Sequence, residues 1–353
     1  MRYRFATFNA TITATMSRGA VALLAPALGW AAAWPPQDAL HADGPQSEHI
    51  LTLWNFTLAL CCVVFVAVLA AFLWALWRAP RASAQNAPDV SSLAQPEHRI
   101  YRTVGWAVGL SVIGLVLLLV ADVFTSRALA QLPMKDAINI ELVGHQWWWE
   151  ARYADPDPSR RFTTANELHI PVGRAVVVTL HSNDVIHTLW VPNLHGKKDL
   201  IPGRTALIRL RADKAGVYRG QCAEFCGLEH AMMALVVVAE PEDRFRAWYE
   251  HQLAAPPAPA APLALRGQQV FTTGTCSMCH TVQGTTANAR LGPDLTHLAS
   301  RSTIAAGMFP NNRGHLAGWI ADAPALKPGV HMPANALPPQ DLQALLSYLE
   351  TLQ

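Results

Sequence analysis

The sequence predicts a multidomain membrane protein that combines a two-helix transmembrane hairpin, an all-β domain and a small all-α C-terminal domain. Two apolar runs near the N-terminus predict the hairpin, and a series of short β-branched runs predicts the β domain. A Pro/Ala-rich stretch then separates a C-terminal segment of small-domain length. The 353 residues leave room for two or three domains, and the formal net charge of +2 gives no sign of a nucleic-acid partner.

Residues 1–33 have the order of a secretory signal peptide. Three arginines precede an apolar stretch, Gly19–Ala33, which ends in three alanines. An uncleaved membrane anchor is the competing interpretation, but this apolar core is short for a membrane span. We therefore predict cleavage near Ala33 and a short exported lead before the first span.

Residues 34–128 are predicted to form the transmembrane hairpin, with spans at about 51–77 and 104–124. The first run carries no charge, and as a helix it would extend about 40 Å, enough to cross a hydrocarbon core of about 30 Å with tilt. Four arginines lie between the spans, whereas residues 34–50 contain no Lys or Arg. The positive-inside rule places the loop in the cytoplasm and everything after the second span on the opposite side.

Residues 129–253 are predicted to be an all-β domain. Short, often alternating runs recur there, separated by turns that contain Pro and Gly, as in sandwiches and barrels. The predicted strands are 138–143, 167–172, 175–181, 206–211, 217–221 and 235–239.

A candidate metal site lies late in this domain, where the sequence reads Cys-x3-Cys-x3-His-x2-Met from Cys222 to Met233. Soft sulfur ligands combined with imidazole select copper, and a thioether is foreign to most zinc sites. The spacing of Cys222 and Cys226 would place both sulfurs on one side of a tight loop, close enough to bridge two metals. A disulfide or a pair of buried thiols is the alternative, but the regular spacing of His230 and Met233 favours a metal.

The C-terminal segment 263–353 follows a Pro/Ala linker at 254–262. It contains Cys276-Ser-Met-Cys279-His280, the motif that attaches c-type haem through two thioethers, with His280 as the proximal ligand. A short helix before this motif and another at 341–351 would complete a small helical domain.

A methionine is expected as the second axial ligand of this haem. Met332, in Val330-His-Met-Pro333, is favoured over Met308 because it lies just before the last helix. Ligation by the neighbouring His331 instead would give a lower reduction potential, since Met/His ligation raises it.

These motifs resemble those of subunit II of the haem–copper oxidases, over roughly residues 48–250, and the haem motif extends the resemblance to members with a fused C-terminal cytochrome c domain. The resemblance implies a cupredoxin-like fold with a dinuclear copper centre, CuA, in its end loops. The two cysteines would bridge the coppers, and an upstream histidine and a loop carbonyl would complete the site. The implied copper ligands are His187, Cys222, the carbonyl of Glu224, Cys226, His230 and Met233.

The resemblance also assigns roles outside the ligand set. In Gly144-His-Gln-Trp-Trp-Trp149, Trp147 matches the tryptophan through which electrons enter, although a core or interfacial aromatic cluster is the alternative. The Glu224 carboxylate matches a ligand of magnesium at the boundary with subunit I. A glutamate that admits protons to subunit I in many relatives has no clear counterpart, because Arg102 occupies the expected place and Glu97 lies more than one turn earlier.

The function implied is that of subunit II in a bacterial terminal cytochrome c oxidase at the inner membrane, with its CuA and cytochrome c domains on the periplasmic side. Electrons from cytochrome c or another periplasmic donor would pass through haem c and CuA to the haem–copper subunit I, with subunit III as a further partner. The complex would reduce oxygen and translocate protons, and this chain alone would have no bond-breaking site.

Two alternatives stay open. The chain could be the CuA-containing subunit of a nitric-oxide reductase of the same superfamily, or a membrane-tethered electron carrier that shuttles between complexes. A quinol oxidase subunit is disfavoured because those proteins share the fold but lack the copper ligands.

Overall fold

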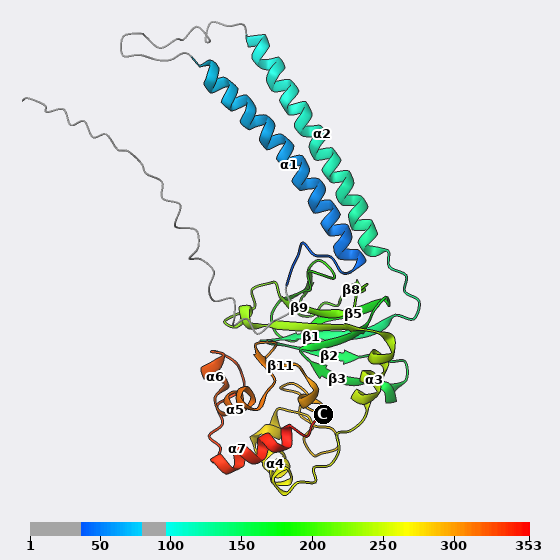
Figure 1. Ribbon diagram of the computed structural model, residues 1–353, viewed down its shortest axis with the longest axis vertical. Helices are drawn as coiled ribbons and strands as arrows, with labels where there is room; N and C mark the ends of the chain where they lie inside the picture. The colour runs from blue at the N-terminus through cyan, green and yellow to red at the C-terminus, as the bar shows by residue number, and fades with distance from the viewer. Residues whose placement is uncertain (1–36, 80–96) are drawn as a thin grey trace, which may run out of the picture. The chain divides into compact units, whose positions relative to one another are not determined.

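The computed structural model describes residues 37–79 and 97–353 (Figure 1). The predicted signal peptide with its cleavage site, and most of the loop predicted to be cytoplasmic, lie outside these ranges. The described residues form a pair of long helices, a β-sandwich and a C-terminal helical domain, which is the order of folds predicted from the sequence.

The two long helices are α1, Pro45–Arg78, and α2, Glu97–Ala130. Each contains an apolar window that is long enough to cross a membrane and entirely unburied within the chain. Exposed apolar surface on this scale needs lipid or another protein to cover it. The helices are longer than the predicted spans at both ends, because helix geometry continues past the apolar windows into polar flanking residues.

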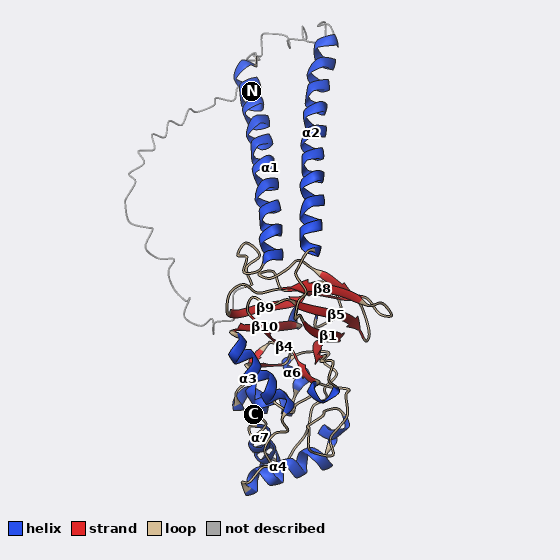
Figure 2. Cartoon of the chain, turned by 90° about the vertical axis from the view of Figure 1, so that its right-hand side faces the viewer, coloured by secondary structure: helices blue, strands red, loops and turns tan. Residues whose placement is uncertain are grey.

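The β domain is a sandwich of two five-stranded sheets with the orders β3-β2-β1-β5-β8 and β4-β10-β9-β6-β7 (Figure 2). The β1–β5 and β4–β10 pairs are parallel, and the other pairs within these sheets are antiparallel. The strands are β1 Ile138–His145, β2 Trp148–Tyr153, β3 Phe162–Ala165, β4 Glu167–Pro171, β5 Val176–Ser182, β6 His187–Trp190, β7 Lys198–Leu200, β8 Ala206–Leu210, β9 Gly216–Cys222 and β10 Ala234–Glu240.

Alternation along the strands builds the sandwich core. In β5, Val176, Val178 and Leu180 are buried while the residues between them are half-buried. The six predicted strands are all present, with ends that differ by one or two residues. Strands β2, β3, β6 and β7 have no predicted counterpart because they are short or lie in motifs interpreted for their chemistry. Helix α3, Glu242–Leu253, then packs Phe245 and Tyr249 onto the sandwich core.

The C-terminal domain begins with α4, Pro262–Thr273, and ends with α7, Pro339–Leu349. The two helices approach closely at Gly267, where a Cβ atom would lie 2.0 Å from the carbonyl oxygen of Ala344. Buried apolar residues including Phe271 and Tyr348 form the core of this domain. Between these helices lie a two-strand pair, β11 Thr303–Ile304 and β12 Phe309–Pro310, and the helices α5 Arg313–Ala321 and α6 Ala323–Leu326.

The first turn of α1 and the segment before it are attached to the β domain by polar contacts. The Ser47 hydroxyl donates to the carbonyl oxygen of Asn193 at 2.7 Å, and the buried Asp43 accepts from Lys214 at 2.8 Å. Helix α2 returns to the same domain, because β1 begins at Ile138 shortly after α2 ends at Ala130. The start of α1 and the end of α2 therefore both adjoin the sandwich, as a helical hairpin requires.

Candidate metal and haem sites

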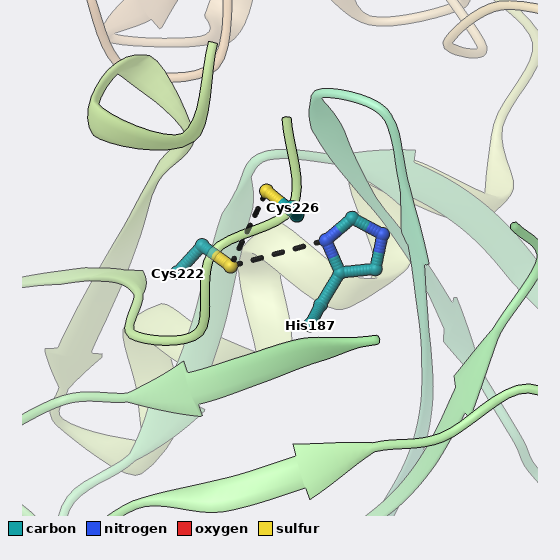
Figure 3. A group of neighbouring side chains, drawn as sticks. All are labelled: His187, Cys222 and Cys226. Atoms are coloured by element: carbon teal, nitrogen blue, oxygen red, sulfur yellow. Dashed lines mark hydrogen bonds between the residues drawn. The ribbon is translucent and has the colours of Figure 1, made fainter. Parts of the chain in front are cut away.

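Three candidate copper ligands meet inside the β domain (Figure 3). His187 begins β6, Cys222 ends β9, and Cys226 lies in the loop that follows. The Cys222 sulfur lies 3.7 Å from the Cys226 sulfur and 3.8 Å from Nδ1 of His187, and all three residues are buried. Both cysteines are free thiols, because a disulfide would bring the sulfurs to about 2.05 Å.

The remaining candidate ligands lie around the same pair of sulfurs. His230 Nδ1 is 3.6 Å from the Cys226 sulfur, and the thioether sulfur of Met233 is 3.9 Å from it. The carbonyl oxygen of Glu224 is 3.2 Å from the Cys222 sulfur. The structure thus gathers all six groups that the sequence motif and the resemblance selected.

The two thiols have opposite acidities. The neighbouring Cys226 thiol, with further help from His187, lowers the pKa of Cys222 despite the opposing effect of burial. The same contact raises the pKa of Cys226, because a second thiolate beside the first would be repelled and poorly solvated. A divalent or monovalent metal between the sulfurs would remove that repulsion, since metal binding deprotonates coordinating thiols.

Asp184 orients His187 and was not selected from the sequence. Its Oδ1 lies 2.7 Å from His187 Nε2, and its Oδ2 accepts from the backbone N–H of Gln146 at 2.6 Å. Burial alone would raise the pKa of Asp184, but the hydrogen bonds with His187 and the backbone lower it. Burial lowers the pKa of His187, and the contact with Asp184 more than reverses this effect. A carboxylate on one ring nitrogen fixes the other nitrogen toward the metal, an arrangement found around many histidine ligands.

The donor set fits a copper pair on its own chemistry. Two thiols, two imidazoles and a thioether form a set that soft, borderline-soft metals select, and a hard cation would need oxygen ligands. Burial of Cys222, Cys226, His187 and Met233 to 2% exposure or less keeps bulk water away from the sulfurs.

Trp147 packs directly on the copper loop, which we define as residues 222–233. Its indole N–H donates to the carbonyl oxygen of Cys226 at 3.0 Å, and its side chain is 6% exposed. Gly227, with a φ of 115°, permits this contact, because a Cβ there would lie 2.9 Å from the indole ring. Trp148 stacks instead on His145, and Trp149 is fully buried in the core.

The haem-attachment motif lies at the end of α4. Cys276 and Cys279 are half-buried free thiols on a short 3-10 turn, and His280 follows. The Nδ1 atom of His280 lies 2.8 Å from the carbonyl oxygen of Pro293, and Gly292 lets the loop 291–295 approach the ring closely. This contact leaves Nε2 for an axial bond. Burial lowers the pKa of His280, which favours the neutral imidazole that a metal requires.

The two methionines considered for the other axial position lie in different surroundings. Both are half-buried. Met308 lies in the turn between β11 and β12, and Met332 follows His331, whose ring lies 5.5 Å from that of Trp147. The assignment of Met332 therefore stays a prediction.

Lys327 is a second residue near the site that sequence reasoning missed. Its side chain is 1% exposed, and its amine donates to carbonyl oxygens of Trp147 and Met232. A lysine in a Pro/Gly-containing loop carries no motif, and only the folded chain shows the contact.

Family models match the β domain and the C-terminal domain. Residues 156–240 match the family described as "Cytochrome C oxidase subunit II, periplasmic domain", and residues 264–353 match "Cytochrome c". The first match implies a CuA copper site, and the second implies haem. Together they cover the parts of the chain that hold the clustered ligands and the haem-attachment motif.

Relatives match over most of the chain. It is 33% identical over 324 residues to cytochrome c oxidase subunit 2 of Alkalihalophilus pseudofirmus, covering 89% of this chain and 90% of that one. It is 32% identical to the subunit of the same name from Bacillus sp. strain PS3, over 70% and 73% of the two chains. A solved periplasmic domain of subunit II from Bradyrhizobium japonicum is 31% identical, with a TM-score of 0.31, over 33% of this chain and 92% of that one. On the full-length similarity and the two domain matches, the chain belongs to the cytochrome c oxidase subunit 2 family.

Proposed function

We propose that this chain is the electron-accepting subunit of a bacterial terminal oxidase. It takes electrons from a reduced periplasmic carrier onto a covalently bound haem c and delivers them by way of CuA to the haem–copper subunit I, where oxygen is reduced and protons are translocated. The observation that carries the proposal is the buried cluster of two thiols, two imidazoles and a thioether in a chain that also contains a haem-attachment motif.

We assign the copper ligands to His187, Cys222, Cys226, His230 and Met233, with the carbonyl oxygen of Glu224. When bound, the copper pair and the haem supply one-electron redox chemistry. The strands β6 and β9 position the donor atoms of His187 and Cys222. The protein also excludes water from the sulfurs.

We assign haem attachment to Cys276 and Cys279 and axial ligation to His280 and Met332. The bond between His280 and the carbonyl of Pro293 fixes the ring orientation. Trp147, which touches both the copper loop and His331, is the residue through which electrons reach the copper loop.

We place the β domain and the C-terminal domain, called the haem domain from here on, on the periplasmic side of the inner membrane. A cleaved signal peptide precedes them in the chain. The four arginines between the two apolar spans support this orientation. Reporter enzymes fused within residues 80–95 and after residue 353 test it: the first fusion should be active in the cytoplasm and the second only after export. A cytoplasmic C-terminus would contradict the proposal, since haem is attached outside the cytoplasm.

Three finer assignments are part of the same proposal. Subunit III is a further partner of the complex, and the Glu224 carboxylate binds magnesium where subunit I is met. The proton-admitting role has no assigned residue, because α2 begins at Glu97 and has Arg102 in its second turn.

Purification of the complex through a tag on this chain tests the function. We expect a polytopic haem-containing subunit to copurify, two copper ions and one covalent haem per chain, and oxygen consumption with a reduced c-type carrier. Consumption of nitric oxide but not oxygen would identify the nitric-oxide reductase instead. Recovery of the chain alone, still loaded with copper and haem, would favour the tethered carrier.

A further inference from the structure

One turn after α6, residues 327–330, which we call the docking turn, brings the C-terminal haem domain against the copper loop. The Val330 N–H donates to the carbonyl oxygen of Lys327 at 3.2 Å. Proline at the second position and a glycine with a φ of 92° at the third are the signature of a type II turn. The docking turn therefore has a defined shape of its own.

Lys327 inserts its side chain from this turn into the β domain. Its Nζ lies 2.8 Å from the carbonyl oxygen of Met232 and 3.1 Å from that of Trp147. Lysine is almost never fully buried unless it is paired, yet this side chain is 1% exposed. One amine thus joins two segments of the β domain, of which one adjoins the ligand Met233 and the other is the tryptophan at the copper loop.

A carboxylate accompanies the buried amine. Glu229 is 4% exposed, and its Oε2 has no hydrogen-bond partner within the described residues. Burial lowers the pKa of Lys327 to about 8, and the charge of Glu229 opposes that effect. Withdrawal of the amine would leave the two carbonyls without this donor and Glu229 without its nearby cation. Such losses are costly for buried groups, so the inserted position is the favoured one.

Close packing accompanies the hydrogen bonds. Gly329 lies so near the copper loop that a Cβ atom would come within 2.9 Å of the Leu228 side chain. The next residue but one, His331, lies against Trp147 with ring centroids 5.5 Å apart. The docking turn therefore brings the segment that carries His331 and Met332 directly onto Trp147.

We propose that Lys327 is a positioning residue, which locks the docking turn onto Trp147 and Met232 and so fixes the separation of the haem from the copper centre. This inference rests on the proposed function and adds a residue that touches neither cofactor site as a ligand. Its amine fixes the docking turn on the copper loop. Its loss frees this turn, while the hydrogen bonds from Ser302 to Glu167 and from the Ala234 N–H to the carbonyl oxygen of Ala306 still join the two domains.

The test uses the full oxidase complex. K327M keeps a side chain of similar length without any N–H donor, K327R restores donors, and K135M alters an exposed lysine between α2 and β1 as a control. After photochemical reduction of the haem, we follow its reoxidation by the copper centre. We expect K327M to slow this transfer by about tenfold to a hundredfold, because small displacements of reacting groups carry penalties of this size. K327R should recover part of the rate, and K135M should leave it unchanged.

Two further readouts separate positioning from general damage. Copper and haem content, and the haem reduction potential, should stay the same in K327M. K327R keeps the buried charge and should keep the copper potential as well. Protease cleavage within residues 254–261 should become faster in K327M, also in protein prepared without copper. If K327M fails to accumulate, G329A supplies the second variant, since a Cβ at a φ of 92° strains the type II turn and should slow transfer in the same way.

The inference would be overturned if K327M and G329A both transferred electrons from haem to copper at the parent rate and resisted protease as the parent does. Slow transfer that K327R does not improve, or that a measured shift of the copper potential accounts for in full, would also overturn it. Failure of the proposed function looks different: the unsubstituted complex would then lack copper or haem, or would show no transfer between them.

Discussion

Oδ1 of Asp184 lies 2.7 Å from Nε2 of His187, while Nδ1 of the same ring faces the Cys222 sulfur at 3.8 Å. The carboxylate thereby selects the ring nitrogen that faces the sulfurs. Removal of such a partner typically weakens metal binding by about tenfold to a hundredfold. We expect D184N to lower copper affinity in this range, as measured by competition with a copper chelator, without changing haem content.

The control for this substitution is D243N, which alters an exposed aspartate in the first turn of α3, outside the copper loop. It should bind copper as tightly as the parent. Equal copper affinity of D184N and the parent would show that packing alone holds His187 in position.

Either bridging cysteine should be essential for the copper pair. C222S or C226S replaces a soft thiolate with a hydroxyl that binds copper poorly. We expect copper to fall well below two ions per chain and the mixed-valence electron paramagnetic resonance signal to disappear. C61S, which changes a free cysteine within α1, is the matched control and should keep both. One zinc and no copper in properly loaded parent protein would refute the assignment.

The axial methionine is tested by comparing M332A with M308A. M332A should keep its haem, because the thioethers to Cys276 and Cys279 are untouched. Its reduction potential should fall by about 100 mV or more, because a thioether ligand raises the potential and its loss admits water or His331. M308A should keep the parent potential and the near-infrared sulfur–iron band. The opposite pattern would make Met308 the ligand.

Acid should destabilise the β domain partly through Glu150. Burial would raise its pKa, but hydrogen bonds with His145 and Arg152 lower it to about 2 from 4.5. A carboxyl group with a lowered pKa in the folded state contributes stability above about pH 4.5, which is lost as the pH falls toward 2. The full contribution is at most about 3 kcal/mol, and solvent screening reduces it.

We expect E150Q to lower the thermal unfolding midpoint of copper-free protein at pH 7, and the difference from the parent to shrink between pH 4.5 and 2. E242Q, which changes an exposed partner of Arg174, should show little difference at either pH. A constant difference between E150Q and the parent across this range would mean that the ionisation of Glu150 is not the cause.

The clustering of Cys222, Cys226, His230 and Met233 could be predicted from the sequence, because their close spacing places the donor groups together in one loop. His187 lies far upstream and was selected only through the family resemblance. The helices of the hairpin could be predicted because a lipid bilayer requires each spanning segment to be long and mostly apolar. The sequence signal for Asp184 is weaker: it consists only of a position three residues before His187. There is no sequence signal for Lys327, because its role depends on a backbone carbonyl 180 residues away, and any residue type offers a carbonyl. The strands β3 and β7 escaped prediction because cross-strand pairing, and not a local pattern, defines such short segments.

The brief connection between the end of α3 at Leu253 and the start of α4 at Pro262 has a consequence for the strength of docking. A short tether replaces association between separate molecules by a local equilibrium at an effective concentration in the millimolar range. Contacts worth only about 4 kcal/mol as a bimolecular affinity would then keep the haem domain docked half of the time. Each further 1.4 kcal/mol shifts that balance about tenfold. Contacts too weak to hold two free proteins together can therefore set how long the haem domain stays on the copper loop in each cycle.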